Sequence, residues 1–147
     1  MIKFGTAHGQ LGPAPIRAAW VLEGKPVARN KLLSRSADGT ASTYVWDCTA
    51  GKFNWHYEVD ETAYVLEGRV IIKDQIGSSR TLEAGDTAFF PRGSKAEWTV
   101  DGYVRKVAFL RVPLPWQVLM AKRFYHALKR LMGSRRSKTE EIVPSMS

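Results

Sequence analysis

The sequence predicts an all-β, antiparallel fold followed by one C-terminal α-helix. Five Trp, five Tyr and six Phe lie mostly in short runs beside β-branched residues, a composition typical of strands. Turn signals that contain glycine separate these runs, and no segment between residues 17 and 112 has the length or period of a crossover helix. The sheet is therefore expected to be antiparallel, within one domain of ordinary size for 147 residues.

The expected strands are short and regularly spaced. They cover residues 16–22, 42–48, 52–58, 62–73, 86–91, 96–100 and 103–112. The turn signals between them contain Gly24, Gly39, Gly51, Gly68, Gly77, Gly85, Gly93 and Gly102. Seven or more short strands with regular turns predict a sandwich or a barrel.

A helical period replaces the strand pattern after Pro113 and Pro115. Ala121, Phe124, Leu128 and Leu131 share one face of this helix, and Lys122, His126 and Lys129 share another. Gly133 is expected to end it. We therefore predict a barrel over residues 1–115, an amphipathic basic helix over 116–133 and a mobile tail over 134–147.

The distribution of charge and the cysteine content bear on nucleic-acid binding and on the cellular location of the protein. Residues 1–120 carry 15 basic and 12 acidic side chains, a net of +3, whereas residues 121–147 carry 7 and 2, a net of +5. The basic character belongs to the C-terminal segment, which argues against a nucleic-acid groove within the fold. The lone Cys48, a first stretch MIKFGTAHGQ without an apolar core and the absence of a long apolar run predict a cytoplasmic protein.

Two motifs carry a family resemblance. The segment WDCTAGKFNWHYEVDETAYVLEGRV, then LEAGDTAFFPRGSKAEW and VRKV, resembles the single-domain cupins of the ureidoglycine aminohydrolase type over residues 17–112. The resemblance implies a small cupin β-barrel, a double-stranded β-helix of the jelly-roll type, which is usually dimeric and holds a ligand pocket inside. It does not imply one chemistry, because a shared fold hosts many activities.

The resemblance also raises the question of a metal. A metal-dependent cupin places two histidines and a glutamate on its first motif and a third histidine on its second, a set suited to Fe, Mn, Ni or Zn. Glu61 falls at the glutamate position, but Trp55, Tyr57 and Ala96 stand at the three histidine positions. His56 alternates with Trp55 and Tyr57 and so points to the other face of its strand. We expect no metal and no other cofactor.

The candidate ligand-binding residues are Trp46, Trp55, Tyr57, Glu61, Trp98 and Lys106. The aromatic residues serve either as core or as a stacking surface. Glu61 faces either solvent or the interior, where it would need a partner such as Lys106 or Arg105. Arg105 and Lys106 are neighbours, so one points inward and the other outward. Cys48 is expected to be inert packing.

These residues support three hypotheses of function. The first is a metal-independent cupin that binds a small polar metabolite in an aromatic pocket. The second is an enzyme acting on an amide, ureide or sugar, with Glu61 as general acid and base. The third is a scaffold that presents the basic helix to a membrane or a protein partner. A homodimer is expected, and residues 116–132 either dock on protein or bind an anionic membrane surface.

Overall fold

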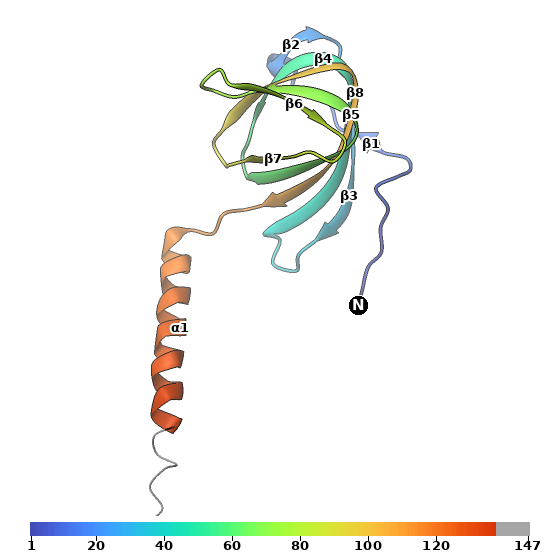
Figure 1. Ribbon diagram of the computed structural model, residues 1–147. Helices are drawn as coiled ribbons and strands as arrows, with labels where there is room; N and C mark the ends of the chain where they lie inside the picture. The colour runs from blue at the N-terminus through green and yellow to red at the C-terminus, as the bar shows by residue number, and fades with distance from the viewer. Residues whose placement is uncertain (138–147) are drawn as a thin grey trace, which may run out of the picture. The chain divides into compact units, whose positions relative to one another are not determined.

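The computed structural model describes the backbone of residues 1–137 and the side chains of residues 1–133. The chain divides into two units, Met1–Pro113 and a second that begins at Leu114. The first unit is an eight-stranded antiparallel sheet that curls round on itself (Figure 1). Its strands are β1 (Gly12–Pro13), β2 (Val21–Gly24), β3 (Ala28–Arg35), β4 (Ala41–His56), β5 (Asp60–Lys73), β6 (Ser79–Glu83), β7 (Thr87–Phe90) and β8 (Lys95–Arg111).

Three long strands form the frame of the sheet. β8 lies between β4 and β5 and pairs with both along most of its length. The first half of β4 pairs with β3 and its second half with β2, while β5 pairs with β7 at its start and with β6 at its end. The long strands therefore pass from one half of the sheet to the other.

The long strands change register at the point where they cross from one half of the sheet to the other. β4 shifts between Thr49 and Gly51, and β5 shifts between Val65 and Ile71. Gly68 lies in this second region with φ +74°, and a Cβ there would stand 1.9 Å from the carbonyl oxygen of Tyr103. Only glycine permits so close an approach of the two strands.

The antiparallel sheet and the C-terminal helix are confirmed, but the predicted closed barrel is not. The hydrogen-bonded path runs β1-β3-β4-β8-β5-β6 and does not close. The predicted turns at Gly51, Gly68 and Gly102 are also wrong, because all three glycines lie within long strands at the register shifts. A glycine that relieves crowding within a bent strand has the same local sequence signature as one in a turn.

Several smaller elements differ from the prediction as well. Residues 16–22 were expected to form a strand, but Ala18–Trp20 form a 3-10 helix, η1, that leads into β2. β3 and β6 were not expected, because ARNKLLSR and SRTLE are too polar to read as strands. Their pairing with β4 and β5 supplies the stability that local propensity lacks.

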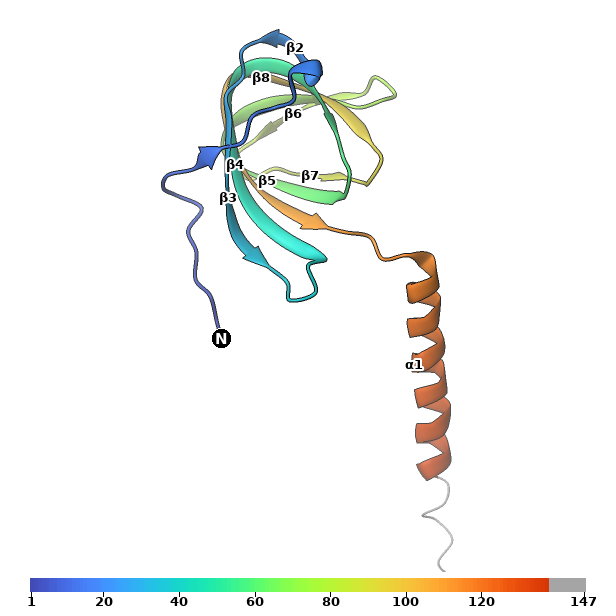
Figure 2. The ribbon, with the colours of Figure 1, turned by 180° about the vertical axis from the view of Figure 1, so that it is seen from behind.

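The main core lies on the inner face of the sheet. It contains aromatic and β-branched residues in alternate positions of the long strands, among them Phe53, Val65, Val70, Trp98 and Val104, all at most 2% exposed. A smaller cluster of Leu11, Val45 and Val107 lies on the outer face. Leu11 comes from the N-terminal segment, which runs along the outside of the sheet and adds β1 to β3 (Figure 2).

The second unit contains helix α1 (Trp116–Ser137). The amides of Val118 and Leu119 both donate to the carbonyl of Pro115, so the helix begins directly after the two prolines. It continues four residues beyond the predicted end at Gly133, because Gly133 does not adopt a positive φ. The predicted tail beyond Ser137 lies outside the described residues. Within the described residues, no helix has the length and hydropathy of a membrane span.

Candidate functional site

A cavity of about 380 Å³ opens on the inner face of the sheet. Its lining is mostly aromatic and aliphatic, with one carboxylate, one ammonium and one amide group. The lining residues are Ala14, Pro15, Asn30, Tyr44, Trp46, Phe53, Trp55, Glu61, Trp98, Lys106, Ala108 and Leu110. Five of the six candidate ligand-binding residues therefore line one cavity.

Strand pairing explains why these side chains meet. Trp46 of β4 stands directly opposite Lys106 of β8, and both point inward. Alternation then turns Arg105 outward, which settles the direction that the sequence left open. In the same way Trp55 pairs with Ala96, a small residue that leaves room beside it.

Glu61 and Lys106 form a buried ion pair in the lining of this cavity. The ammonium of Lys106 contacts the Glu61 carboxylate, and only 7% of each side chain is exposed. Ala63 and Ala108 pair between them in the sheet, so the lysine side chain can extend past small neighbours to reach the carboxylate. Glu61 thus faces the interior with Lys106 as its partner. Burial without that partner would cost each charge several kcal/mol.

Two indole rings hold the lysine from the sides. The Lys106 Nζ lies 5.0 Å from the ring centroid of Trp46 and 4.6 Å from that of Trp98. The two rings meet edge to face with their centroids 5.7 Å apart. Cation–π attraction of this kind is strongest where water is excluded. The aromatic residues are therefore both core and supports for the charged pair.

Tyr57 is the candidate residue that does not line this cavity. Its ring stacks on Phe90 at 4.5 Å, and its hydroxyl accepts a hydrogen bond of 3.0 Å from Trp98 Nε1. Burial, and after it the nearby Glu61 charge, raise the pKa of Tyr57 well above its ordinary value. Tyr57 instead borders a neighbouring hollow of about 280 Å³, which shares Pro15, Trp55, Glu61 and Leu110 with the first.

The three histidine positions of a metal-dependent cupin hold no histidine in this chain. Trp55 and Ala96 pair across β4 and β8, and the Tyr57 amide bonds to Ser94 beside them, so the positions are adjacent as in a metal site. The indole of Trp55 and the methyl group of Ala96 cannot coordinate a transition metal ion, and the Tyr57 hydroxyl, whose pKa is raised by burial, accepts a hydrogen bond from Trp98 instead. His56 lies on the other face, with its ring 5.0 Å from that of Trp20. Among the described residues, no three His, Cys, Asp or Glu side chains form a cluster that could hold a metal.

Cys48 lies in the core beside Trp46 and is fully buried. Burial, together with the adjacent Asp47 charge, raises the pKa of its thiol to about 12. A thiol of this kind is protonated at neutral pH and is a poor nucleophile.

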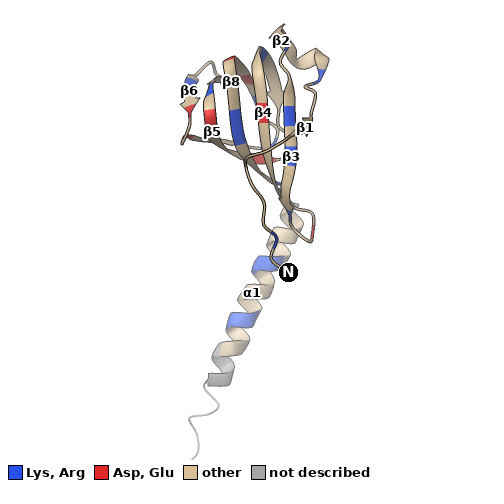
Figure 3. Cartoon of the chain, turned by 90° about the vertical axis from the view of Figure 1, so that its right-hand side faces the viewer, with Lys and Arg blue, Asp and Glu red and all other residues tan. Residues whose placement is uncertain are grey.

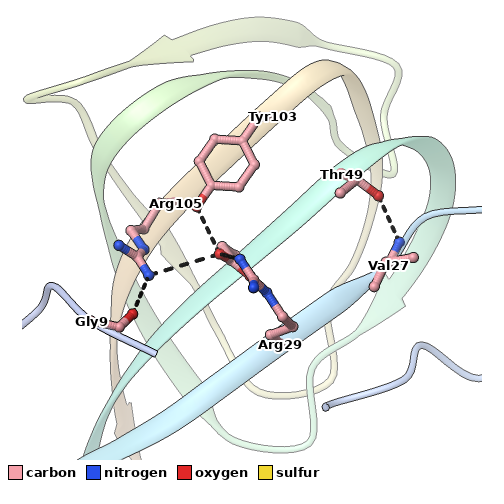
Figure 4. A network of polar contacts seen from close by, with 7 residues as sticks. Gly9, Val27, Arg29, Thr49, Tyr103 and Arg105 are labelled. Carbon is pink, nitrogen blue, oxygen red and sulfur yellow. Dashed lines mark hydrogen bonds and ion pairs between the residues drawn. The ribbon is translucent and has the colours of Figure 1, made fainter. Parts of the chain in front are cut away.

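A second polar cluster lies on the outer face of the sheet (Figure 4). Arg29 Nε and the Tyr103 hydroxyl donate hydrogen bonds of 3.0 and 2.7 Å to the carboxylate of Asp47, which is 1% exposed. Arg105 lies 3.9 Å from the same carboxylate and donates to the carbonyl of Gly9. This cluster fastens the N-terminal segment to the outside of the sheet.

The sequence interpretation missed several lining residues. Tyr44 and Phe53 alternate with Trp46 and Trp55 on β4, so period-two reasoning was sufficient to identify them. Asn30 and Pro15 carry no such signal, because they reach the cavity through the pairing of β3 with β4 and the course of the N-terminal segment.

Comparisons with known proteins agree with this architecture. Residues 35–108 match the EutQ-like cupin domain. The chain is 30% identical to a protein of unknown function of the DUF861 family from Pseudomonas syringae pv. tomato str. DC3000, over 71% of this chain and 46% of that one, with a TM-score of 0.66. It therefore spans about half the length of that protein.

Two further structures share the fold. The EutQ protein of Clostridium difficile is 24% identical over 58% of this chain and 63% of its own, with a TM-score of 0.52. A putative ethanolamine utilization protein Q from Salmonella typhimurium LT2 is 22% identical over 73% of this chain and 98% of its own, also with a TM-score of 0.52. No curated protein matches the chain.

Proposed function

Since the chain belongs to the EutQ-like cupin family, we propose that its cavity binds a small polar metabolite without the help of a metal ion. The observation that carries the proposal is the Lys106–Glu61 pair in the lining of an aromatic cavity. Apolar cavities with a few convergent polar groups are the usual form of a small-molecule site.

The pair limits the chemistry of the ligand. Lys106 supplies hydrogen-bond donors and a positive charge, and Glu61 supplies acceptors and a negative charge. A ligand that carries both a carbonyl or carboxylate oxygen and an N–H or O–H group complements both side chains. Amides, ureides and sugar acids have these groups, and flat members of the first two classes can also stack on Trp46 or Trp98.

The lysine also gives a physical reason why a metal is unnecessary. Glu61 stands at the position of the glutamate ligand in metal-dependent cupins, and here the Lys106 ammonium contacts it. A fixed ammonium can polarise a ligand oxygen electrostatically, as a bound cation does elsewhere. We propose that Lys106 provides the positive charge of this pocket.

Catalysis is the second candidate function. Its support is that Glu61 lines the cavity, within reach of a bound ligand as well as of Lys106. A carboxylate so placed can accept a proton from a bound amide or sugar hydroxyl. Turnover that survives Trp55→Ala but is lost in Glu61→Gln favours an enzyme, whereas binding without turnover favours a binding module.

A thermal-shift screen tests the proposal. The panel contains N-carbamoylglycine as a ureide, N-acetylglycine as an amide and glucuronate as a sugar acid, each added to native protein, Trp55→Ala and Trp116→Ala. Trp116 serves as the matched control because it lies in helix α1 and not in the cavity lining. We expect at least one compound to raise the melting temperature of the native protein and of the control.

Loss of the indole from the cavity should weaken that binding by about tenfold, because stacking contacts and buried area are lost together. If no member of the panel stabilises the native protein, or if Trp55→Ala binds as tightly as native, the proposed function is wrong.

A further inference from the structure

An apolar stripe runs along one side of helix α1, with cationic residues beside it and opposite it. With about 3.6 residues per turn, Trp116, Met120, Phe124, Ala127, Leu128 and Leu131 lie on one side of the helix. The opposite side carries Lys122 and Lys129 together with Val118, whereas Arg123 and Arg130 border the apolar side next to Trp116. Two faces of this kind are typical of a helix that lies at a boundary between an apolar and an aqueous phase.

The charge on this helix has one sign only. Residues 116–137 contain no Asp or Glu, and Figure 3 accordingly shows Lys and Arg but no acidic residue along the described part of α1. A surface helix that only had to stay in water would usually mix both signs in i, i+4 pairs. The cationic face therefore complements a surface that is itself negative.

The apolar face is rich in residues suited to a lipid interface. Trp116 and Phe124 are bulky aromatics on this face, and the indole N–H of Trp116 bonds well at the level of lipid headgroups. Nucleic acid would use the cations but leave the apolar face uncovered. An acidic protein groove would also suit both faces, but nothing in the helix specifies a protein shape.

We propose that helix α1 binds in the plane of an anionic membrane surface, with its aromatic face toward the acyl chains and its lysines and arginines toward the headgroups. Juxtaposed cations and apolar side chains act together in this mode, since each basic residue adds electrostatic attraction and the apolar face adds buried area. The proposal is independent of the ligand cavity in the sheet.

Co-sedimentation of the full chain with lipid vesicles tests this. We expect the native protein to pellet with mixed phosphatidylcholine–phosphatidylserine vesicles and to stay in solution with pure phosphatidylcholine vesicles. Lys122→Glu combined with Lys129→Glu should weaken binding by at least about 25-fold, because each basic residue near an anionic surface is worth roughly fivefold in affinity.

The matched control is Lys25→Glu combined with Lys73→Glu, which changes the net charge equally at exposed positions of the unit that contains the sheet, one in the loop after β2 and one at the end of β5. It should bind anionic vesicles as the native chain does. Phe124→Asp combined with Leu131→Asp tests the apolar face and should also abolish binding. Circular dichroism of each variant measures its helical content. A variant that keeps the native helical content but does not bind has lost affinity and not the helix.

Several results would overturn the proposal. One is a native chain that stays in solution with both kinds of vesicle, and another is a native chain that binds both equally. A third is a Lys25/Lys73 control that loses binding as strongly as the helix variant, which would mean that net charge alone drives the attraction. The native chain could also fail to bind vesicles and differ in solution mass from the variant with Phe124 and Leu131 replaced. That result would show that the apolar face contacts protein instead.

Discussion

Lys106 and Glu61 are each other's counter-charge inside the sheet. Because 7% of each side chain is exposed, removal of one partner leaves the other buried and uncompensated. We predict that Lys106→Met lowers the free energy of unfolding by about 3–5 kcal/mol. Urea denaturation measures this change.

The double variant Lys106→Met with Glu61→Gln is the control for that prediction. It removes both charges and should recover most of the loss, since a neutral amide is far cheaper to bury than a carboxylate. Equal stability of the single and double variants would mean that the two charges do not interact as the structure indicates.

Asp47 makes the outer face of the sheet sensitive to acid. Burial raises its pKa, but the hydrogen bonds from Arg29 and Tyr103 and the charges of Arg29 and Arg105 outweigh burial and hold the pKa below its ordinary value. Such a carboxylate stabilises the fold above its unfolded pKa, and the contribution is lost as the pH falls through the folded pKa.

We therefore predict that the native protein loses stability below about pH 4 and that Asp47→Asn loses less over the same range, because its side chain does not titrate. At neutral pH the variant should be the less stable of the two. Denaturation midpoints measured across this range check the prediction, and parallel pH profiles for the two proteins would refute it.

At the scale of the elements, Gly68 carries the crossing of β5 past β8. Gly68→Ala should be severely destabilising, by several kcal/mol, because its Cβ would overlap the Tyr103 carbonyl at 1.9 Å and its φ is +74°. Gly77→Ala is the control, since Gly77 has φ +89° but nothing within 4 Å.

The control variant should lose only about 1–2 kcal/mol, the usual strain of a left-handed residue with a side chain. Thermal unfolding of the two variants gives the comparison. Equal losses would show that the two strands do not approach each other as closely as described.

Strand alternation explains how much of the site was predictable. It placed Phe53, Trp55 and Tyr57 on one face and His56 on the other, and the structure agrees, because the three aromatics join the core cluster and His56 is exposed. It could not decide whether Arg105 or Lys106 points inward, because alternation fixes relative and not absolute faces. Lys106 of β8 pairs with Trp46 of β4, which lines the cavity, and this pairing shows that Lys106 points inward.

The elements that the sequence did not reveal depend on distant pairing. The predicted strands 42–48 and 52–58 are two halves of β4, and 96–100 and 103–112 are two halves of β8. Each half has strand propensity. That β4 continues through Gly51 and β8 through Gly102 depends on the bend that the paired strands make together at the register shift. A local pattern contains no information on that bend.

For the whole molecule, an exposed aromatic patch bears on the expected dimer. Phe109 pairs with Thr62, and Thr62 pairs with Phe89, so the two phenylalanines flank one threonine on the outer face of the sheet. Phe89 is 62% and Phe109 49% exposed. We expect a second copy of the chain to cover this patch.

Phe109→Glu should therefore reduce the mass measured by light scattering from that of a dimer to that of a monomer. Ile76→Glu is the control, since Ile76 lies 89% exposed outside the strands, and it should leave the mass unchanged. A native protein that is already monomeric would contradict the expected dimer, and a Phe109→Glu variant that remains dimeric would place the interface elsewhere.

The central claim is that Lys106, and no metal ion, supplies the positive charge of the ligand pocket. Calorimetric titration of chelator-treated protein with N-carbamoylglycine, N-acetylglycine and glucuronate tests it most directly, with elemental analysis of the same sample as a check. We predict that at least one compound binds the metal-free protein with the same affinity as the untreated protein. The double variant Lys106→Met with Glu61→Gln should bind that compound at least about tenfold more weakly. Binding that disappears on removal of a stoichiometric metal and returns when the metal is restored would contradict the account.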